Sequence, residues 1–163
     1  MRWFTTLLVA AFTLIAAQTA FAGGAKSALD LEILSQQSTW TNQSGSMATI
    51  DLSRSSQPYT YTVSGVYVNN APAFKCRGTP YPVTGIYYAN SGMISFNVAW
   101  SSANEDCGSV TGWTGYIVFN RASAHMITDW NLVFTGAVGP QIALGKDTFT
   151  LNVNKLSKNM MSN

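Results

Sequence analysis

Hydrophobic and polar side chains alternate along three segments of the chain. Residues 94–100 follow this pattern, with Phe96 and Trp100 among the apolar positions, and residues 113–119 and 126–134 repeat it. A two-residue period places alternate side chains on opposite faces of an extended backbone. Each segment is therefore predicted to be a half-buried β-strand.

Five further segments are rich in residues that favour strands and are bounded by turn residues. They lie at residues 38–41, 47–52, 59–68, 83–89 and 148–153. Asn, Gly, Ala, Ser and Pro cluster between strands, at residues 69–72, 90–92, 120–123 and 136–140. About eight strands with short links predict an all-β fold, and an eight-stranded barrel can hold one small ligand. The pattern alone favours an up-and-down β-barrel only slightly over a β-sandwich.

The first 22 residues have the organisation of a secretory signal peptide. Arg2 supplies a positive charge, residues 7–17 form an almost unbroken apolar run, and residues 20–22 match the A-x-A cleavage pattern. The apolar run is too short to span a bilayer. We therefore expect a mature chain that begins at Gly23 and is secreted, to a periplasm or to the outside of the cell.

The mature chain is predicted to contain one domain. Residues 23–37 form an N-terminal extension, residues 38–153 the β-barrel, and residues 154–163 a polar, flexible tail. Only 10% of all residues are charged, and the formal net charge of +2 includes Arg2 of the leader. Because there is no basic stripe and no Lys/Arg run, we predict neither nucleic acid nor a membrane as a partner.

Cys76 and Cys107 both fall in the exported part of the chain. In an oxidising compartment two cysteines most simply form one intrachain disulfide. Closing a loop of that length stabilises a fold by about 3–4 kcal/mol in the chain-entropy model. His125 is the one histidine of the sequence, and with two cysteines it cannot complete a closed tetrahedral metal site. No metal site is predicted.

Signatures of catalysis are weak in this sequence. It contains no G-x-S-x-G nucleophile motif, and His125 stands alone at the start of a predicted strand. Glu105 and Asp106 lie together in a polar loop, where solvated charges explain them, and no acidic pair matches a glycosidase dyad. We therefore predict that the protein is not an enzyme and has no catalytic residue.

Three tryptophans, Trp100, Trp113 and Trp130, lie in phase with the apolar faces of their predicted strands. Periodicity alone favours an ordinary barrel core for them, as in a purely structural secreted β-domain. Four polar residues with no evident structural role nevertheless lie close to aromatic residues or at the start of a predicted strand: Asn69, Ser109, Thr111 and Asp147. Aromatic walls with a few polar groups are typical of a small-molecule pocket, so binding is favoured over catalysis.

Six sequence blocks resemble, in order, the strands of avidins. They are residues 39–46 (TWTNQSGS), 65–69 (GVYVN), 96–100 (FNVAW), 109–116 (SVTGWTGY), 130–132 (WNL) and 145–149 (GKDTF). The chain is thus similar to the avidin/streptavidin family over nearly all of its mature length. Residues 80–85 (PYPVTG) and the placement of the cysteines resemble the dimeric bacterial avidins. The resemblance implies an eight-stranded antiparallel up-and-down β-barrel that binds biotin with high affinity, without catalysis and without a cofactor. A barrel for another small heterocyclic or hydrophobic ligand is the alternative.

The resemblance also implies roles for individual residues. The ureido oxygen of biotin would accept hydrogen bonds from Asn42, Ser46 and Tyr67. Its two ureido N–H groups would donate to Asn69 and Asp147, and Thr111 would contact the thioether sulfur. The carboxylate would bind Ser109 and the backbone amides around Asn70, Ala71 and Ala73. The aromatic residues around the ligand would be Phe96, Trp100, Trp113 and Trp130.

Two departures from the tetrameric avidins affect these implications. Many of those proteins have Ser or Thr where this chain has Asn69, although an amide oxygen can accept the same N–H. They also lend a tryptophan to a neighbour's pocket from the loop before the last strand, and residues 139–144 contain none. We therefore expect a homodimer, with larger assemblies left open. We also hypothesise that a disulfide between Cys76 and Cys107 replaces the missing lid by rigidifying the loop over the pocket mouth.

Overall fold

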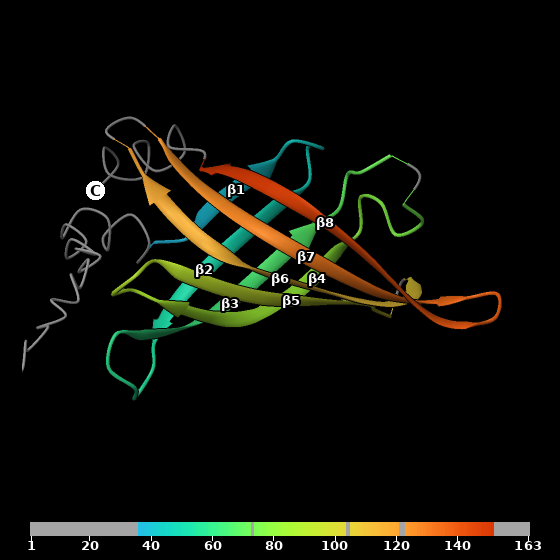
Figure 1. Ribbon diagram of the computed structural model, residues 1–163, viewed down its shortest axis with the longest axis horizontal. Coiled ribbons are helices and arrows are strands. Elements are labelled where there is room, and N and C mark those ends of the chain that lie inside the picture. Colours follow the sequence, from blue (N-terminus) through green and yellow to red (C-terminus); the bar gives the residue numbers. More distant parts are fainter. Residues whose placement is uncertain (1–35, 73, 104, 121–122, 152–163) are drawn as a thin grey trace, which may run out of the picture.

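The computed structural model describes residues 36–72, 74–103, 105–120 and 123–151, which form eight β-strands. In chain order these are β1 (Ser38–Asn42), β2 (Met47–Arg54), β3 (Thr60–Val68), β4 (Pro80–Tyr88), β5 (Met93–Ser101), β6 (Asp106–Phe119), β7 (Ala124–Gly136) and β8 (Gly139–Leu151). Each strand pairs with its neighbours in sequence, and β8 pairs antiparallel with β1, so the sheet closes into a barrel (Figure 1). The closed sheet confirms the predicted up-and-down barrel and excludes the sandwich. The predicted signal peptide and tail, and most of the N-terminal extension, lie outside the described residues.

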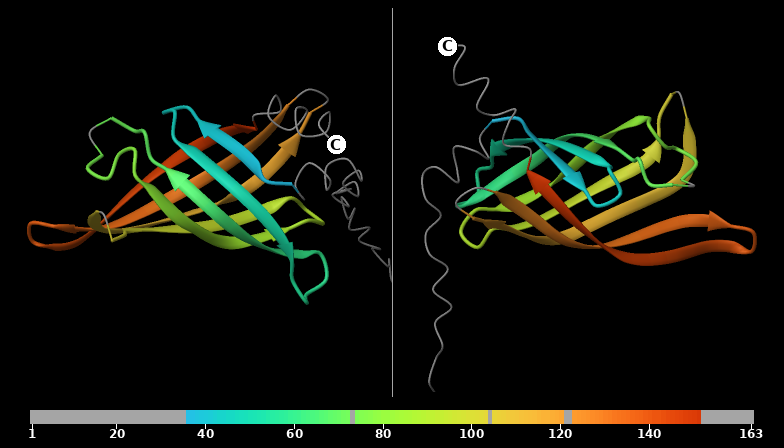
Figure 2. Two further views of the ribbon diagram at one scale, coloured as in Figure 1. Left: turned by 180° about the vertical axis from the view of Figure 1, so that it is seen from behind. Right: turned by 90° about the horizontal axis from the view of Figure 1, so that it is seen from above.

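The predicted start of the last strand was wrong. β8 begins at Gly139, nine residues before residue 148, and only Ala137 and Val138 remain in the turn that joins it to β7. The alternation is hidden there because the outward side chains of Ile142 and Leu144 are apolar, whereas the inward positions beside them are small. β4 and β6 also begin earlier than predicted. The β7–β8 hairpin therefore projects well past the rest of the barrel (Figure 2).

Aromatic side chains fill the barrel interior. Those that are at most 3% exposed are Trp40, Tyr67, Tyr81, Tyr87, Phe96, Trp100, Trp113 and Phe149. The indole of Trp113 lies at the centre of this group, with ring centroids 4.9 Å from Phe96 and 5.0 Å from Tyr67. Stacked aromatic pairs contribute about 0.5–1.5 kcal/mol beyond the area they bury. The result is a rigid aromatic floor across the barrel.

The described part of the chain lacks two kinds of feature. No helix in it is long and apolar enough to cross a membrane. No three His, Cys, Asp or Glu side chains in it are grouped so that they could hold a metal ion.

Candidate functional site

A cavity of about 230 Å³ opens beside the β1–β2 turn and the β3–β4 loop. It is compact, since sites for drug-sized ligands usually measure about 300–1,000 Å³. Ten predicted site residues line it: Asn42, Ser46, Tyr67, Asn69, Ala71, Trp100, Thr111, Trp113, Trp130 and Asp147. Five residues that the sequence did not single out also line it: Gln43, Ser44, Phe74, Leu132 and Lys146.

The other four predicted site residues do not line the cavity. Phe96 stacks behind the indole of Trp113. Asn70 ties the β3–β4 loop to the β1–β2 turn through a hydrogen bond from its Nδ2 to the Gly45 carbonyl, 2.8 Å. Ser109 is half-buried on β6, and its Oγ has no hydrogen-bond partner among the described residues. Ala73 lies outside the described residues.

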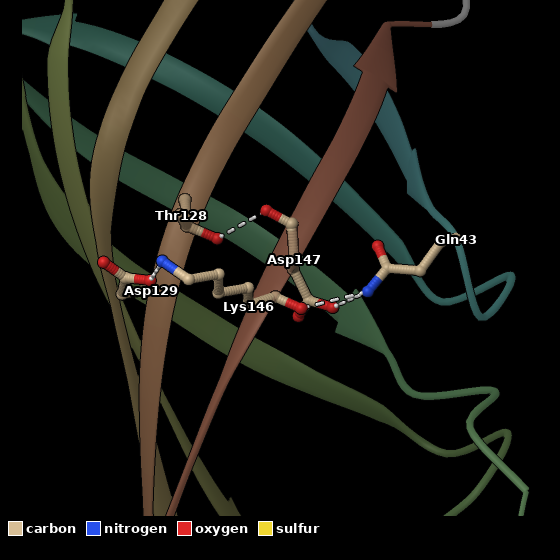
Figure 3. Close-up of polar contacts among 5 residues, drawn as sticks. All are labelled: Gln43, Thr128, Asp129, Lys146 and Asp147. Atoms are coloured by element: carbon tan, nitrogen blue, oxygen red, sulfur yellow. Dashed lines mark hydrogen bonds and ion pairs between the residues drawn. The ribbon is translucent and has the colours of Figure 1, made fainter.

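Asp147 on β8 is the carboxylate of the cavity and is only 7% exposed. Its Oδ1 accepts hydrogen bonds from Nδ2 of Asn42 at 3.1 Å and from Nε2 of Gln43 at 2.8 Å, the latter drawn in Figure 3. Its Oδ2 accepts from Nε1 of Trp113 at 2.8 Å. Charge-assisted hydrogen bonds of this kind compensate a buried carboxylate for its lost water. Three N–H donors, two from consecutive residues at the end of β1 and one from β6, therefore fix this group in one orientation.

Asn42 is oriented by the turn that follows it. Its Oδ1 accepts from the backbone amides of Ser44 at 3.0 Å and Ser46 at 2.8 Å, which is an Asx turn. Gly45 allows the turn to close, because its φ of +78° lies in the left-handed region. With the oxygen engaged by the backbone, the Nδ2 group must face the cavity. One of its hydrogens bonds Asp147, and the other is available to a ligand.

Ser46 and Asn69 form a second polar cluster. The Ser46 Oγ accepts from the Asn70 backbone amide at 2.9 Å and donates to Oδ1 of Asn69 at 3.3 Å. The same Oδ1 accepts from the Ala71 backbone amide at 2.8 Å. Both acceptor positions of the Asn69 amide oxygen are thus occupied in the ligand-free cavity. In this cluster, the hydroxyl proton of Ser46 is the one that can turn to a different acceptor.

The phenol of Tyr67 is almost wholly buried, at 1% exposure. Burial raises its pKa well above the ordinary value for tyrosine, and the negative charge of Asp147 raises that pKa further, whereas a hydrogen bond with Ser46 lowers it. The phenol of Tyr67 therefore keeps its proton at neutral and mildly alkaline pH. It can act as a hydrogen-bond donor over that whole pH range.

The tryptophans both wall the cavity and direct its polar groups. Nε1 of Trp100 donates to Oγ1 of Thr111 at 2.7 Å. Because the Thr111 hydroxyl accepts this bond, its own proton points away from Trp100. Trp130 lies across β8 at Gly145, where a Cβ would come within 2.2 Å of the indole ring. Only glycine leaves room for the ring in that position. The predicted core role and the predicted pocket role of these tryptophans are therefore compatible.

The β3–β4 loop, residues 69–79, is fastened at the cavity mouth. The predicted disulfide between Cys76 and Cys107 is confirmed and joins this loop to the start of β6, with a Cα–Cα distance of 6.1 Å. A hydrogen bond from the Gly78 amide to the Asn69 carbonyl, 2.8 Å, closes the loop on itself. Phe74 reaches from the loop to the cavity wall. Its ring meets that of Trp100 edge-on, at a centroid distance of 5.0 Å.

Comparison with known proteins agrees with this geometry. The sequence profile of the Avidin family matches residues 31–152. Hoefavidin from Hoeflea phototrophica is 45% identical over 96% of this chain and 94% of its own length. Afifavidin from Afifella pfennigii is 46% identical over 74% of this chain and 71% of its own. The crystal structure of a rhizavidin–biotin complex superposes with a TM-score of 0.64 at 42% identity and covers 73% of this chain and 94% of that one. The chain therefore belongs to the avidin family.

Proposed function

We propose that the protein binds biotin in this cavity, reversibly and without catalysing a reaction. The observation that carries the proposal is the convergence of Asn42, Ser46, Tyr67 and Asp147 above an aromatic floor in one compact cavity. Three of these side chains supply hydrogen-bond donors and the fourth supplies an acceptor, which matches the oxygen and an N–H of a cyclic urea. The biotin complex of rhizavidin, a related barrel, supports this choice of ligand.

Binding of the urea requires a small rearrangement at Ser46. Its hydroxyl has one proton, which points to Asn69 in the ligand-free cavity. When that proton turns to the ureido oxygen, it frees one acceptor position on Asn69 for the second ureido N–H. The exchange leaves Ser46 and Asn69 paired, since the Asn70 amide continues to donate to Ser46. Ser109 lies on β6 two residues before Thr111, which lines the cavity, and we propose its unpaired hydroxyl as a donor for the biotin carboxylate.

The direct test is titration of the oxidised, mature protein with biotin. One equivalent per chain is expected to quench tryptophan fluorescence, because Trp100, Trp113 and Trp130 line the cavity. Isothermal calorimetry is expected to give the same stoichiometry. No heat and no quenching at protein concentrations of tens of micromolar would contradict the proposal and favour either another small ligand or a purely structural role.

We further propose a homodimer formed through the outer face of β6, β7 and β8. Val110, Val133 and Ile142 lie in register across these strands, and Leu144 follows on the same face of β8. Their exposures are 48%, 43%, 69% and 76%. Contiguous apolar patches of this kind mark interaction surfaces. A second copy of the chain is the partner we propose for this face, because most soluble oligomers are twofold symmetric homodimers.

Ile142→Lys is expected to convert this dimer into monomers, because it would bury an unpaired charge at the centre of the interface. Light scattering coupled to size exclusion would then give half the wild-type mass. Ile86→Lys is the matched control, since Ile86 is 58% exposed on the outer face of β4. A monomeric wild-type protein, or an unchanged mass for Ile142→Lys, would exclude this interface.

We also propose that the mature protein is exported. The leader-like pattern of residues 1–22 supports export, as does the disulfide between Cys76 and Cys107, because such bonds persist in oxidising compartments. N-terminal sequencing of the protein recovered from the periplasm or the medium is expected to begin at Gly23.

A further inference from the structure

The side chain of Gln43 continues the pairing of β1 with β8 beyond the end of β1. Backbone pairing between these strands ends at Asn42, opposite Phe149. Beyond that point, Oε1 of Gln43 accepts from the Thr148 backbone amide and its Nε2 donates to the Lys146 carbonyl, each at 3.0 Å. A side-chain amide thereby takes the place of a peptide group opposite Asp147.

The same amide also bonds the carboxylate between those two backbone groups. Nε2 of Gln43 carries two hydrogens, one for the Lys146 carbonyl and one for Oδ1 of Asp147 at 2.8 Å (Figure 3). Both hydrogens and the oxygen of this exposed side chain are therefore used. The amide is held by the β8 backbone on two sides, so its bond to the carboxylate has a fixed direction.

Neighbouring groups do not duplicate this contact. The ammonium of Lys146, the residue next to Asp147, pairs at 2.5 Å with Asp129 on the outer face of the barrel (Figure 3). Thr128 donates to the backbone carbonyl of Asp147 at 3.3 Å, which positions the strand and leaves the carboxylate untouched. Among the described residues, the carboxylate contacts are those of Asn42, Gln43 and Trp113.

These contacts determine which oxygen can serve a ligand. A carboxylate has about four acceptor positions, two on each oxygen. Asn42 and Gln43 occupy both positions on Oδ1, whereas Trp113 occupies one on Oδ2. The remaining acceptor position of Asp147 is therefore on Oδ2. If Gln43 were absent, Oδ1 would have a free position as well, and the carboxylate could rotate to share its donors differently.

We infer that Gln43 is a positioning residue for ligand binding: it saturates Oδ1 of Asp147 and so presents Oδ2 to the ligand N–H. The inference rests on the proposed binding of biotin for its functional consequence. Its structural part concerns the ligand-free protein. The two parts can therefore be tested separately.

The first experiment uses the ligand-free protein and the indole N–H resonance of Trp113. This proton bonds Oδ2 of Asp147, so it reports the orientation of the carboxylate. In Gln43→Met, which keeps the length of the side chain and removes its amide, the resonance is expected to move from its wild-type position. Gln57→Met is the matched control, because Gln57 lies in the β2–β3 turn, outside the cavity. Its Trp113 resonance is expected to remain in place.

The second experiment measures the dissociation rate of biotin. Gln43→Met is expected to raise that rate about tenfold, in line with the loss of one hydrogen bond to a charged group, and to change the association rate little. Gln57→Met is expected to match the wild type. A wild-type protein that does not bind biotin would contradict the proposed function, whereas the resonance of Trp113 would still decide the structural role of Gln43.

Gln43→Glu provides a second variant with a readout that a purely structural role would not move. Protonated, the new carboxyl can donate to Asp147; ionised, it repels Asp147 across the same contact. Of the other titratable residues that line the cavity, Tyr67 is buried beside Asp147, whereas the ammonium of Lys146 is exposed and pairs with Asp129 on the outer face. Biotin release from Gln43→Glu is expected to be several times faster at about pH 8 than at about pH 5, beyond any change in the wild type. An unmoved Trp113 resonance together with wild-type release rates in both Gln43 variants would overturn the inference.

Discussion

Asp147→Ala is expected to weaken biotin binding by about a thousandfold or more. The substitution removes the acceptor for one ureido N–H, and it also leaves three donors around the empty position without their partner: Asn42, Gln43 and Trp113. The donors lose their partner in the free and in the bound protein alike, so that loss lowers the stability of the fold. Affinity falls because the buried ureido N–H loses a charged acceptor, and truncating one partner of such a contact costs about 2–5 kcal/mol. A loss of about 4 kcal/mol corresponds to a factor of about a thousand in the dissociation constant.

Asp147→Asn separates the loss of charge from the loss of shape. An amide has one oxygen, so its NH2 group must face either the donors on the Oδ1 side or the indole of Trp113. An intermediate loss of affinity is therefore expected. Asp129→Asn is the control, because Asp129 is exposed and pairs with Lys146 on the outer face. Calorimetry or competition against a labelled biotin would measure all three, and an Asp147→Ala affinity within tenfold of the wild type would contradict this role.

The fold was largely predictable because most strands bury one face and expose the other. β5 shows this clearly, with Ile94, Phe96, Val98 and Trp100 buried and Asn97 and Ala99 exposed between them. The start of β8 was not predictable for the opposite reason. There the outward face is as apolar as a core face, since Ile142 and Leu144 belong to the proposed interface. Periodicity identifies strands whose outer face is polar, and it fails where the outer face is as apolar as the inner one.

The cavity was predictable through the family resemblance more than through the pattern. Periodicity could not separate core tryptophans from cavity tryptophans, because Trp113 is both: it stacks in the core and bonds Asp147. Gln43 was missed because an amide in a turn looks like an ordinary solvated residue in the sequence. Its adjacency to Asn42 in the NQSGS turn was the one available signal, and its role depends on the pairing of β1 with a strand about a hundred residues away.

The second large effect is expected from removing the disulfide by replacing both Cys76 and Cys107 with alanine. The bond joins residues 31 positions apart, so its loss is expected to lower the free energy of unfolding by about 3–4 kcal/mol in the chain-entropy model. Chemical denaturation of the variant and of the wild type under oxidising conditions would measure this difference. Alanine is suitable because Cys76 is fully buried, where a serine hydroxyl would need a partner.

The same variant also tests the hypothesis that the disulfide substitutes for a lid over the cavity. Without the bond, the β3–β4 loop keeps its hydrogen bonds to the β1–β2 turn and the contact from Thr79 Oγ1 to Glu105 at 3.0 Å. These hold its two ends, whereas the segment around Phe74 and Cys76 loses its attachment to β6. Biotin release is therefore expected to accelerate at least several-fold. Thr79→Val is the control, because it removes one fastening of the loop and leaves the disulfide intact.

The two measurements distinguish two roles for one covalent bond. If the disulfide acts only on the unfolded chain, the free energy of unfolding falls and the release rate at low temperature stays at the wild-type value, since the folded loop is unchanged. If it also restrains the loop over the mouth, release accelerates under conditions in which the variant remains fully folded. A lower stability with unchanged release would therefore remove the lid hypothesis and leave the stabilising role intact.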